Sequence, residues 1–178
     1  MIKKIAYIGA HSSAKTTTVN RLSQFLKDMG IPYVVVPEVP RDCPLPFNQE
    51  GGMAAQLWMI NEQVRRELEA EKEAFEILKT LQPEEVYIIC DRSLWDYMAY
   101  SRSLARIGTM TAEDLRIITN QITGLVQSME PYDIIYFCET KPLYEDGVRD
   151  TDPEWQKEIY VCFKQVVKDF SLKVTVVQ

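Results

Sequence analysis

The sequence predicts an α/β domain in which a parallel β-sheet is covered by helices on both faces. Five mostly apolar segments with strand character alternate with segments of helical periodicity along the 178 residues. No Gly/Ser-rich linker, repeat or low-complexity stretch interrupts this alternation. The hydrophobic fraction of 46% is enough to fill the core of one domain of this length. We therefore expect residues 1–178 to form a single domain, with ligands at the carboxyl ends of the strands.

The first predicted unit is a β-strand, a tight loop and an α-helix. The apolar run 5–8 is the strand, and the loop occupies residues 9–16. A helix is predicted next because apolar side chains recur three or four residues apart. These side chains are Val19, Leu22, Leu26 and Met29. Gly30 and Pro32 are typical of the end of such a helix.

The loop is predicted to bind phosphate. It follows the pattern G-x-x-x-x-G-K-[ST], with Gly9, Lys15 and Thr16 at defining positions. In such a loop, backbone N–H groups surround the phosphates, the lysine reaches their outer oxygens and the hydroxyl ligates Mg²⁺. The helix that follows points the positive end of its dipole at the same anion. The residues that we expect to bind the phosphates are Gly9, His11, Ser12, Ser13, Ala14, Lys15, Thr16 and Thr17.

One position departs from this pattern, because Ala14 stands where the second glycine is expected. If the backbone there has a positive φ, the methyl group costs about 1 kcal/mol or more. We therefore expect nucleotide binding to be weakened rather than abolished. His11, within the loop, is expected to shield or hydrogen-bond the phosphates without a catalytic role.

A second strand is predicted at 33–36, followed by a proline-rich loop and a long helix that ends before Pro83. One face of this helix is apolar. It is formed by Met53, Leu57, Ile60, Val64 and Leu68. The alternating Glu, Arg and Lys residues between positions 62 and 76 are interpreted as the solvated side of the helix.

The second half of the chain continues the alternation. Gly108 ends one predicted helix, a capping-box pattern at 111–114 begins another, and Asp152 with Pro153 begins the last. The predicted elements are a strand at 86–90, a helix at about 94–107, a helix from 111, a strand at 133–138, a helix from 153 and a strand at 172–177.

Composition disfavours several classes of function. A formal net charge of −6 and a pI of about 4.9 disfavour a surface that binds nucleic-acid polymers or anionic lipid. The four cysteines show no C-x-x-C spacing and His11 is the only histidine, so a zinc site is not expected. Reduced, mostly buried thiols and a cytoplasmic location are expected instead. No segment is long enough to span a membrane.

Charged residues follow three of the predicted strands, at the carboxyl ends where ligands bind in such folds. Glu38 follows the second strand, Asp91 and Arg92 the third, and Lys141 the fourth. Asp91 could hold Mg²⁺ or take a proton from an attacking hydroxyl. Arg92 could clamp a phosphate or a substrate oxygen. An ordinary strand-to-helix turn would explain the same residues, but the phosphate-binding loop favours a functional role.

These motifs resemble those of the nucleoside and nucleotide kinase branch of P-loop proteins, which includes thymidylate kinases and deoxyribonucleoside kinases. The resemblance is strongest to small ATP-binding domains similar to bacterial ribosylnicotinamide kinase. There the loop is accompanied by a Glu after the second strand, a D-R-x-x-x-D-x-x-x-Y stretch and a late D-G-x-R, which here are Glu38, 91–100 and 146–149. The resemblance implies a P-loop NTPase three-layer sandwich with a five-stranded parallel sheet of order 2-3-1-4-5, and a lid at about 141–155.

The resemblance also implies roles for single residues. Lys15 and Thr16 correspond to the ligands of the triphosphate and of Mg²⁺. Glu38 is assigned as the base that faces the acceptor hydroxyl and Asp91 as the metal partner, although the base assignment stays open between them. Arg149, in the lid, could neutralise charge on the transferring group, with a plain surface arginine as the alternative. The predicted catalytic residues are Lys15, Glu38, Asp91, Arg92 and Arg149, and the predicted metal ligands are Thr16 and Asp91.

The acceptor is expected to contact side chains from the exit of the second strand, the long helix and the helix after the third strand. The candidates are Arg41, Trp58, Gln63 and Tyr97. An aromatic ring can stack on a base, and a glutamine can read the edge of a base. A core position is the alternative interpretation of Trp58.

Together these observations predict an ATP- and Mg²⁺-dependent phosphotransferase acting on a nucleoside, nucleotide or ribosyl-pyridine acceptor. A small-molecule acceptor is expected as the partner, with no nucleic-acid polymer and no membrane, and a homodimer stays open. The alternative, which Ala14 keeps open, is a nucleotide-binding switch or regulatory module that hydrolyses ATP or GTP slowly. The segment 139–143 lacks the final Asp of the Asn/Thr-Lys-x-Asp element that reads guanine, which favours ATP.

Overall fold

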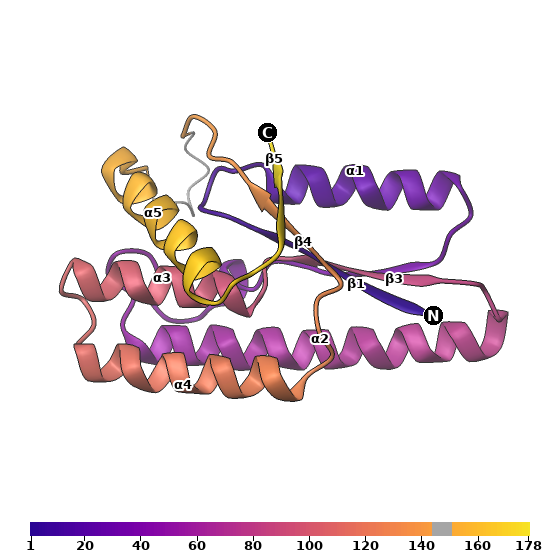
Figure 1. Ribbon diagram of the computed structural model, residues 1–178, viewed down its shortest axis with the longest axis horizontal. Coiled ribbons are helices and arrows are strands. Elements are labelled where there is room, and N and C mark those ends of the chain that lie inside the picture. The colour runs from indigo at the N-terminus through magenta and orange to yellow at the C-terminus, as the bar shows by residue number, and fades with distance from the viewer. Residues whose placement is uncertain (144–150) are drawn as a thin grey trace.

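The computed structural model describes residues 1–143 and 151–178 (Figure 1). Strands and helices alternate along the chain, with one short 3₁₀ helix, η1. The elements are β1 (Ile2–Ile8), α1 (Lys15–Asp28), β2 (Tyr33–Val36), η1 (Pro40–Asp42), α2 (Met53–Leu81), β3 (Val86–Asp91), α3 (Leu94–Arg106), α4 (Ala112–Ser128), β4 (Ile134–Cys138), α5 (Pro153–Asp169) and β5 (Val174–Val177).

The five strands form one parallel sheet in the order β2-β3-β1-β4-β5. This confirms the fold class and the strand order that the resemblance implied. The central strand β1 pairs with β3 on one side and with β4 on the other. Tyr7, near the end of β1, pairs with Asp91 at the end of β3. The loop that leaves β1 therefore lies next to the residues that follow β3.

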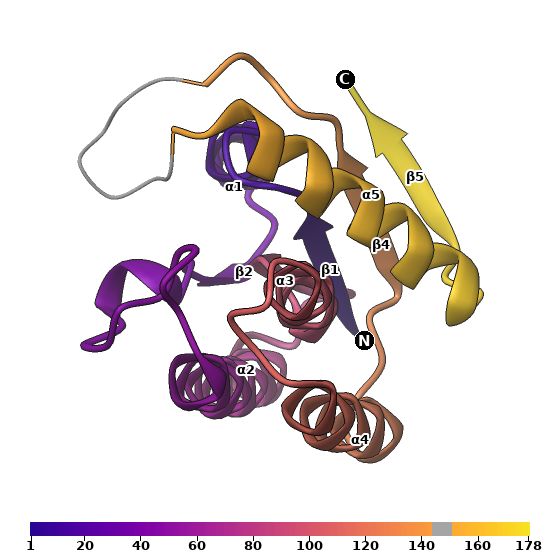
Figure 2. The same ribbon diagram turned by 90° about the vertical axis from the view of Figure 1, so that its left-hand side faces the viewer.

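Helices cover both faces of the sheet. The larger hydrophobic core lies on the face covered by α2, α3 and α5, with α4 packed against α2 and α3. On the opposite face α1 packs its Val19 and Leu26 against Ile5, Tyr7 and Ile89. Figure 2 shows α1 on one side of the strands and α2 with α4 on the other. Among the described residues, no helix has both the length and the apolar character needed to cross a membrane.

The predicted helix ends are set by the expected local signals. Thr111 and Asp114 form a capping box, and the Asp152 side chain accepts hydrogen bonds from the backbone N–H groups of Glu154 and Trp155. Gly30 has a φ of +68°, which suits a glycine after a helix. The last strand begins at Val174, two residues later than predicted.

The long helix α2 packs most of its predicted apolar face against the core, with Ile60 buried and Met53, Leu57 and Val64 partly buried, but the buried side is turned toward Glu67. Leu68, expected on the apolar face, is 51% exposed, whereas Glu67 is 0% exposed. Glu67 Oε2 lies 2.7 Å from Nζ of Lys4, which is itself 2% exposed on β1. The interpretation of the charged residues between 62 and 76 as a solvated side is therefore wrong for Glu67. The buried cation on β1 has its carboxylate partner on the side of α2 that faces the sheet, next to the buried apolar residues of that helix.

Candidate active site

The phosphate-binding loop joins the carboxyl end of β1 to the start of α1. Gly9 has a φ of +149°, and a Cβ at this position would lie 2.7 Å from the carbonyl oxygen of Cys138 and 2.9 Å from Ser13 Oγ. Both contacts are shorter than real Cβ atoms make. Glycine is required here because the loop passes directly against the end of β4.

Ala14 is the residue immediately before α1 and has φ +59° and ψ +23°. The second glycine position of the motif therefore has left-handed backbone here, which is unfavourable for alanine by roughly 1–2 kcal/mol. Thr18 N donates to Ala14 O at 3.0 Å, so this strained residue begins the hydrogen bonding of the helix.

Replacing Ala14 with glycine is expected to raise the free energy of unfolding by up to about 1 kcal/mol, because strain is relieved in part at the expense of a more flexible unfolded chain. Urea denaturation monitored by circular dichroism measures the change. The exposed Ala54→Gly variant in the first turn of α2 is the matched control, and its stability should fall. Equal destabilisation of both variants would contradict the strain at position 14.

Lys15 folds back across the loop that precedes it. Its Nζ donates to Gly9 O at 2.7 Å, to Ala10 O at 2.8 Å and to Ser13 Oγ at 3.1 Å. Burial lowers the pKa of Lys15 to about 8, and Arg92 contributes in the same direction. A phosphate bound in this loop would give the ammonium group the negative partner that the loop carbonyls supply only partly.

The lowered pKa of Lys15 predicts pH-dependent nucleotide binding. Above pH 8 the free protein loses the Lys15 proton, whereas a bound triphosphate favours the charged form and raises the pKa. Binding then takes up a proton, so the affinity for AMP-PNP should fall above about pH 8, by at most about tenfold per pH unit. Calorimetry across this range checks the result, and an affinity that stays constant up to about pH 10 would contradict it.

Thr16 and Asp91 meet where the sequence placed a metal site. Thr16 Oγ1 donates to Asp91 Oδ2 at 2.5 Å, and Asp91 is 2% exposed. Its other oxygen, Oδ1, is buried without a hydrogen-bond partner among the described residues. A hydroxyl beside a carboxylate with an unused buried oxygen suits Mg²⁺, which prefers oxygen ligands. These two residues therefore fit the group that the motif implies.

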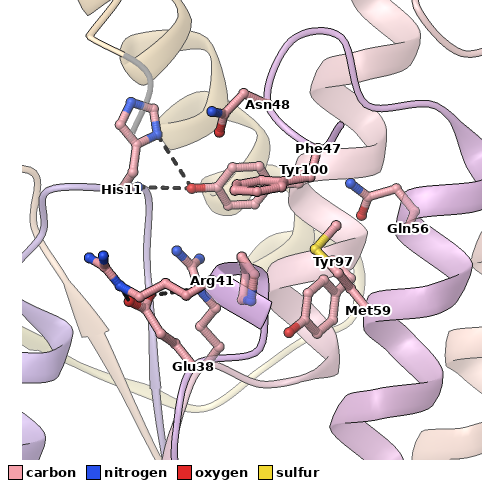
Figure 3. Close-up of a pocket in the computed structure, with 11 residues that line it drawn as sticks. His11, Glu38, Arg41, Phe47, Asn48, Gln56, Met59, Tyr97 and Tyr100 are labelled. Carbon is pink, nitrogen blue, oxygen red and sulfur yellow. Dashed lines mark hydrogen bonds and ion pairs between the residues drawn. The ribbon is translucent and has the colours of Figure 1, made fainter. Parts of the chain in front are cut away.

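A pocket opens beside this loop, and its empty space, counted together with the solvent at its mouth, is about 540 Å³. It is bounded by the phosphate-binding loop, the segments that follow β2 and β3, η1, and helices α2 and α3 (Figure 3). The residues that line it are His11, Glu38, Pro40, Arg41, Phe47, Asn48, Gln56, Met59, Arg92, Tyr97 and Tyr100. Aromatic and apolar walls with a few convergent polar groups are typical of small-molecule sites.

The charged groups of this pocket form a chain of ion pairs around Glu38. Its Oε1 pairs with Nε of Arg41, and its Oε2 lies 3.7 Å from Nε of Arg92. Burial raises the pKa of Glu38, but Arg92 and Arg41 together lower it by more than burial raises it. The net pKa therefore lies below its usual value. Glu38 is therefore an ionised carboxylate at neutral pH, able to accept a proton.

Asp96 is a residue of the site that the predicted set did not include. It is fully buried, and it accepts hydrogen bonds from the backbone N–H groups of Gly9 at 3.3 Å and Ser93 at 2.9 Å. Burial raises its pKa to about 6, against the opposing effect of Arg92, whose Nη1 lies 3.6 Å away. Asp96 thus ties the phosphate loop to the start of α3. In the sequence, Asp96 is the second Asp of the D-R-x-x-x-D-x-x-x-Y stretch and stands at capping-box spacing from Ser93.

Of the four predicted acceptor residues, Arg41 and Tyr97 line the pocket, and Trp58 and Gln63 are absent from its described lining. Gln63 is fully buried beneath the pocket. Its Nε2 donates to Glu67 Oε1 at 2.8 Å and to Arg92 O at 3.4 Å, and its Oε1 accepts from Tyr97 at 3.1 Å. These bonds occupy the amide, so the expectation that Gln63 reads the edge of a base is wrong in this structure. Trp58 packs against the hydrophobic core, as its alternative interpretation had it.

One predicted catalytic residue lies outside the described part of the chain, and three residues of the pocket were not predicted. Arg149 and the rest of the 146–149 motif lie outside the described residues, as do residues 144–150 of the predicted lid. Phe47, Asn48 and Gln56 are pocket residues that the sequence reasoning missed. Two of them come from the loop before α2, which has no periodic pattern to identify which side chains point inward.

Comparisons with known proteins agree with this fold. The model of a family described as AAA domain matches residues 4–178. No curated protein matches. Among solved structures, the NadR protein in complex with NAD and AMP-PNP is similar with a TM-score of 0.70 and 16% identity, covering 99% of this chain and 44% of that chain. This chain thus spans less than half the length of NadR.

Deoxyadenosine kinase from M. mycoides is similar in two structures, each with a TM-score of 0.62 and covering 90% of that chain. One holds dCMP and a flexible dCDP, at 14% identity over 98% of this chain, and the other holds dATP, at 15% identity over 99%. At these identities the likeness shows the fold, which matches the P-loop nucleoside kinase-like family that the motifs resemble. With the family model matched over residues 4–178, the chain belongs to the AAA domain family of P-loop proteins.

Proposed function

We propose that this protein transfers the γ-phosphate of ATP to a hydroxyl group of a small nucleoside, nucleotide or ribosyl-pyridine acceptor. The observation that carries this proposal is the pocket beside the phosphate-binding loop, with the ionised Glu38 and the guanidinium of Arg92 in its wall. A nucleotide-binding switch needs a phosphate loop but has no need of an adjoining pocket that contains a base. The neighbours hold NAD, AMP-PNP and deoxynucleotides, which is consistent with a nucleotide donor and a small nucleoside-type acceptor.

The residues have distinct proposed roles in the transfer. Backbone N–H groups of the loop and Lys15 hold the triphosphate, and Thr16 with Asp91 would hold Mg²⁺, which neutralises charge on the phosphate oxygens. Glu38 takes the proton of the acceptor hydroxyl as that oxygen bonds to the γ-phosphorus. The bond between this phosphorus and the leaving ADP oxygen breaks, and Arg92 stabilises the negative charge that develops on the phosphate oxygens. Arg149, from outside the described residues, is proposed to add a second cation.

The charges of the pocket favour an acceptor without a phosphate. Arg92 lies between Glu38 and Asp96, and Arg41 is paired with Glu38, so both arginines already have carboxylate partners. An acceptor phosphate would have to displace a carboxylate or draw on a cation from outside the described residues. Matched pairs of a nucleoside and its monophosphate therefore belong in the acceptor panel.

A second candidate is a regulatory ATPase without a small-molecule acceptor. The left-handed backbone at Ala14 favours it, because strain in the phosphate loop is expected to weaken nucleotide binding. In this case water would be the only nucleophile, and the lid segment would signal to another protein.

The deciding experiment is ADP release from ATP and Mg²⁺ across nucleosides, their monophosphates and nicotinamide riboside. An acceptor-free reaction and the Lys15→Ala variant are the controls, since loss of the loop cation should cost about 10²–10³-fold in rate. Stimulation by one acceptor, with phosphorylated product, supports the kinase. A slow rate that no acceptor alters supports the regulatory ATPase and rejects phosphotransfer.

A further inference from the structure

Tyr100, on α3, contacts both the phosphate-binding loop and the acceptor pocket (Figure 3). Its hydroxyl oxygen accepts a hydrogen bond from the backbone N–H of His11 at 2.9 Å, and its ring lines the pocket. Backbone N–H groups of such loops surround bound phosphates. One backbone N–H donor of the loop therefore bonds to a side chain that lies 89 residues away in the sequence.

On the pocket side, contacts continue from Tyr100 to η1. The guanidinium carbon of Arg92 lies 5.5 Å from the centre of the Tyr100 ring, a distance at which a cation is attracted to the ring face. Arg92 Nε lies 3.7 Å from Glu38 Oε2, and Glu38 Oε1 pairs with Arg41 on η1. A shift of the Tyr100 ring therefore alters the surroundings of these ion pairs.

His11 is also held from α5. Gln156 Nε2 donates to His11 O at 3.0 Å and to Lys141 O at 3.1 Å. The His11 ring lies 5.3 Å from the ring of Trp155, which the Tyr100 ring meets edge-on at 5.9 Å. His11 is fixed between α3 and α5, so a change in the loop on phosphate binding acts on both helices.

Tyr97 offers an internal comparison. It lies one helical turn before Tyr100 on α3 and also lines the pocket. Its hydroxyl donates to Gln63 Oε1 on α2 at 3.1 Å instead of contacting the phosphate loop. The two tyrosines thus share a helix and a pocket but differ in the element that their hydroxyl groups contact.

We propose that Tyr100 is a positioning residue that couples nucleotide binding at the phosphate loop to the shape of the acceptor pocket. The inference rests on the proposed function, since it takes this pocket as the place of the acceptor. Nucleotide binding shifts the His11 N–H group, Tyr100 follows, and the ion pairs of Arg92, Glu38 and Arg41 close around the pocket. By linkage, nucleotide and acceptor each strengthen the binding of the other by the same factor.

Cys43, directly after η1, provides a probe of this pocket-bordering segment that needs no acceptor. It is partly exposed, whereas Cys90, Cys138 and Cys162 are buried. The experiment measures the rate at which Ellman's reagent modifies the full chain with and without saturating AMP-PNP and Mg²⁺, and Cys43→Ser identifies the signal. We expect the nucleotide to slow the modification of Cys43 roughly fivefold or more.

In Tyr100→Phe this response is expected to fall below about twofold, whereas Tyr97→Phe should keep it. Both substitutions retain the ring, so the contacts with the core remain, and thermal melts verify folding. A wild-type response in Tyr100→Phe, or an equal loss in Tyr97→Phe, would overturn the proposal. So would a wild-type protein whose labelling ignores the nucleotide, a result that depends on no variant.

Phosphate transfer is measured separately with the acceptor panel. A nucleotide effect on Cys43 that requires the Tyr100 hydroxyl, without transfer to any acceptor, would remove the proposed function and leave the coupling in place. Phosphate transfer without a nucleotide effect on Cys43 would remove the coupling and leave the proposed function in place.

Discussion

Replacing Glu38 with glutamine is expected to lower kcat by about 10²–10⁴-fold while AMP-PNP still binds. The amide keeps the shape of the side chain but cannot take the proton of an acceptor hydroxyl. Because Arg92 and Arg41 hold the pKa of Glu38 below its usual value, the wild-type base is already ionised at neutral pH. Its activity should therefore show no loss from protonation of Glu38 until the pH falls below the usual range for a glutamate.

Steady-state kinetics with the best acceptor, together with calorimetry for AMP-PNP, separate the effect on rate from the effect on binding. Glu113→Gln is the matched control, because Glu113 is an exposed glutamate paired with Arg116 on α4. Its kcat should stay at the wild-type value. Full turnover by Glu38→Gln would assign the base to Asp91 instead, and Asp91→Asn would then test that assignment.

Replacing Lys4 with methionine is expected to lower the free energy of unfolding by about 3–5 kcal/mol. Lys4 Nζ lies 2.7 Å from Glu67 Oε2 and 2.8 Å from Glu71 Oε1, and both Lys4 and Glu67 are buried. The substitution would leave the negative charge of the Glu67 carboxylate without its cation in the core, next to Gln63. Urea denaturation of the variant and the wild type gives the difference.

The pH range of this effect follows from the pKa of Lys4. Burial lowers the pKa of Lys4, but Glu67 and Glu71 together raise it by more than burial lowers it. The net pKa therefore lies above the usual 10.5. The contribution of the pair is therefore complete at neutral pH and is lost only as the pH rises through this raised value. Lys157→Met, which removes an exposed pair with Glu154, is the control and should cost about 0–1 kcal/mol. A loss below about 1 kcal/mol in Lys4→Met would show that the buried pair is not needed.

The fold was accessible from the sequence because its signals are local. Alternation of apolar runs and helical periods identified the elements, and residues such as Gly30 and Thr111 marked their ends. The phosphate-binding loop could also be predicted from the sequence, since one continuous segment supplies Gly9, Lys15 and Thr16. The structure confirms the parallel sheet and its order, and it gives Ala14 the positive φ on which the expected strain depended.

The pocket beside the phosphate-binding loop depends on the tertiary structure. Its wall combines a loop without periodicity, which supplies Phe47 and Asn48, with helix faces whose orientation depends on distant partners. Gln63 lies two turns after Gln56 on the same side of α2, but its amide bonds to Glu67, Arg92 and Tyr97 beneath the pocket. A local pattern can indicate that a helix has a buried side, but which residues that side presents to a ligand is set by charges that meet only when the chain folds.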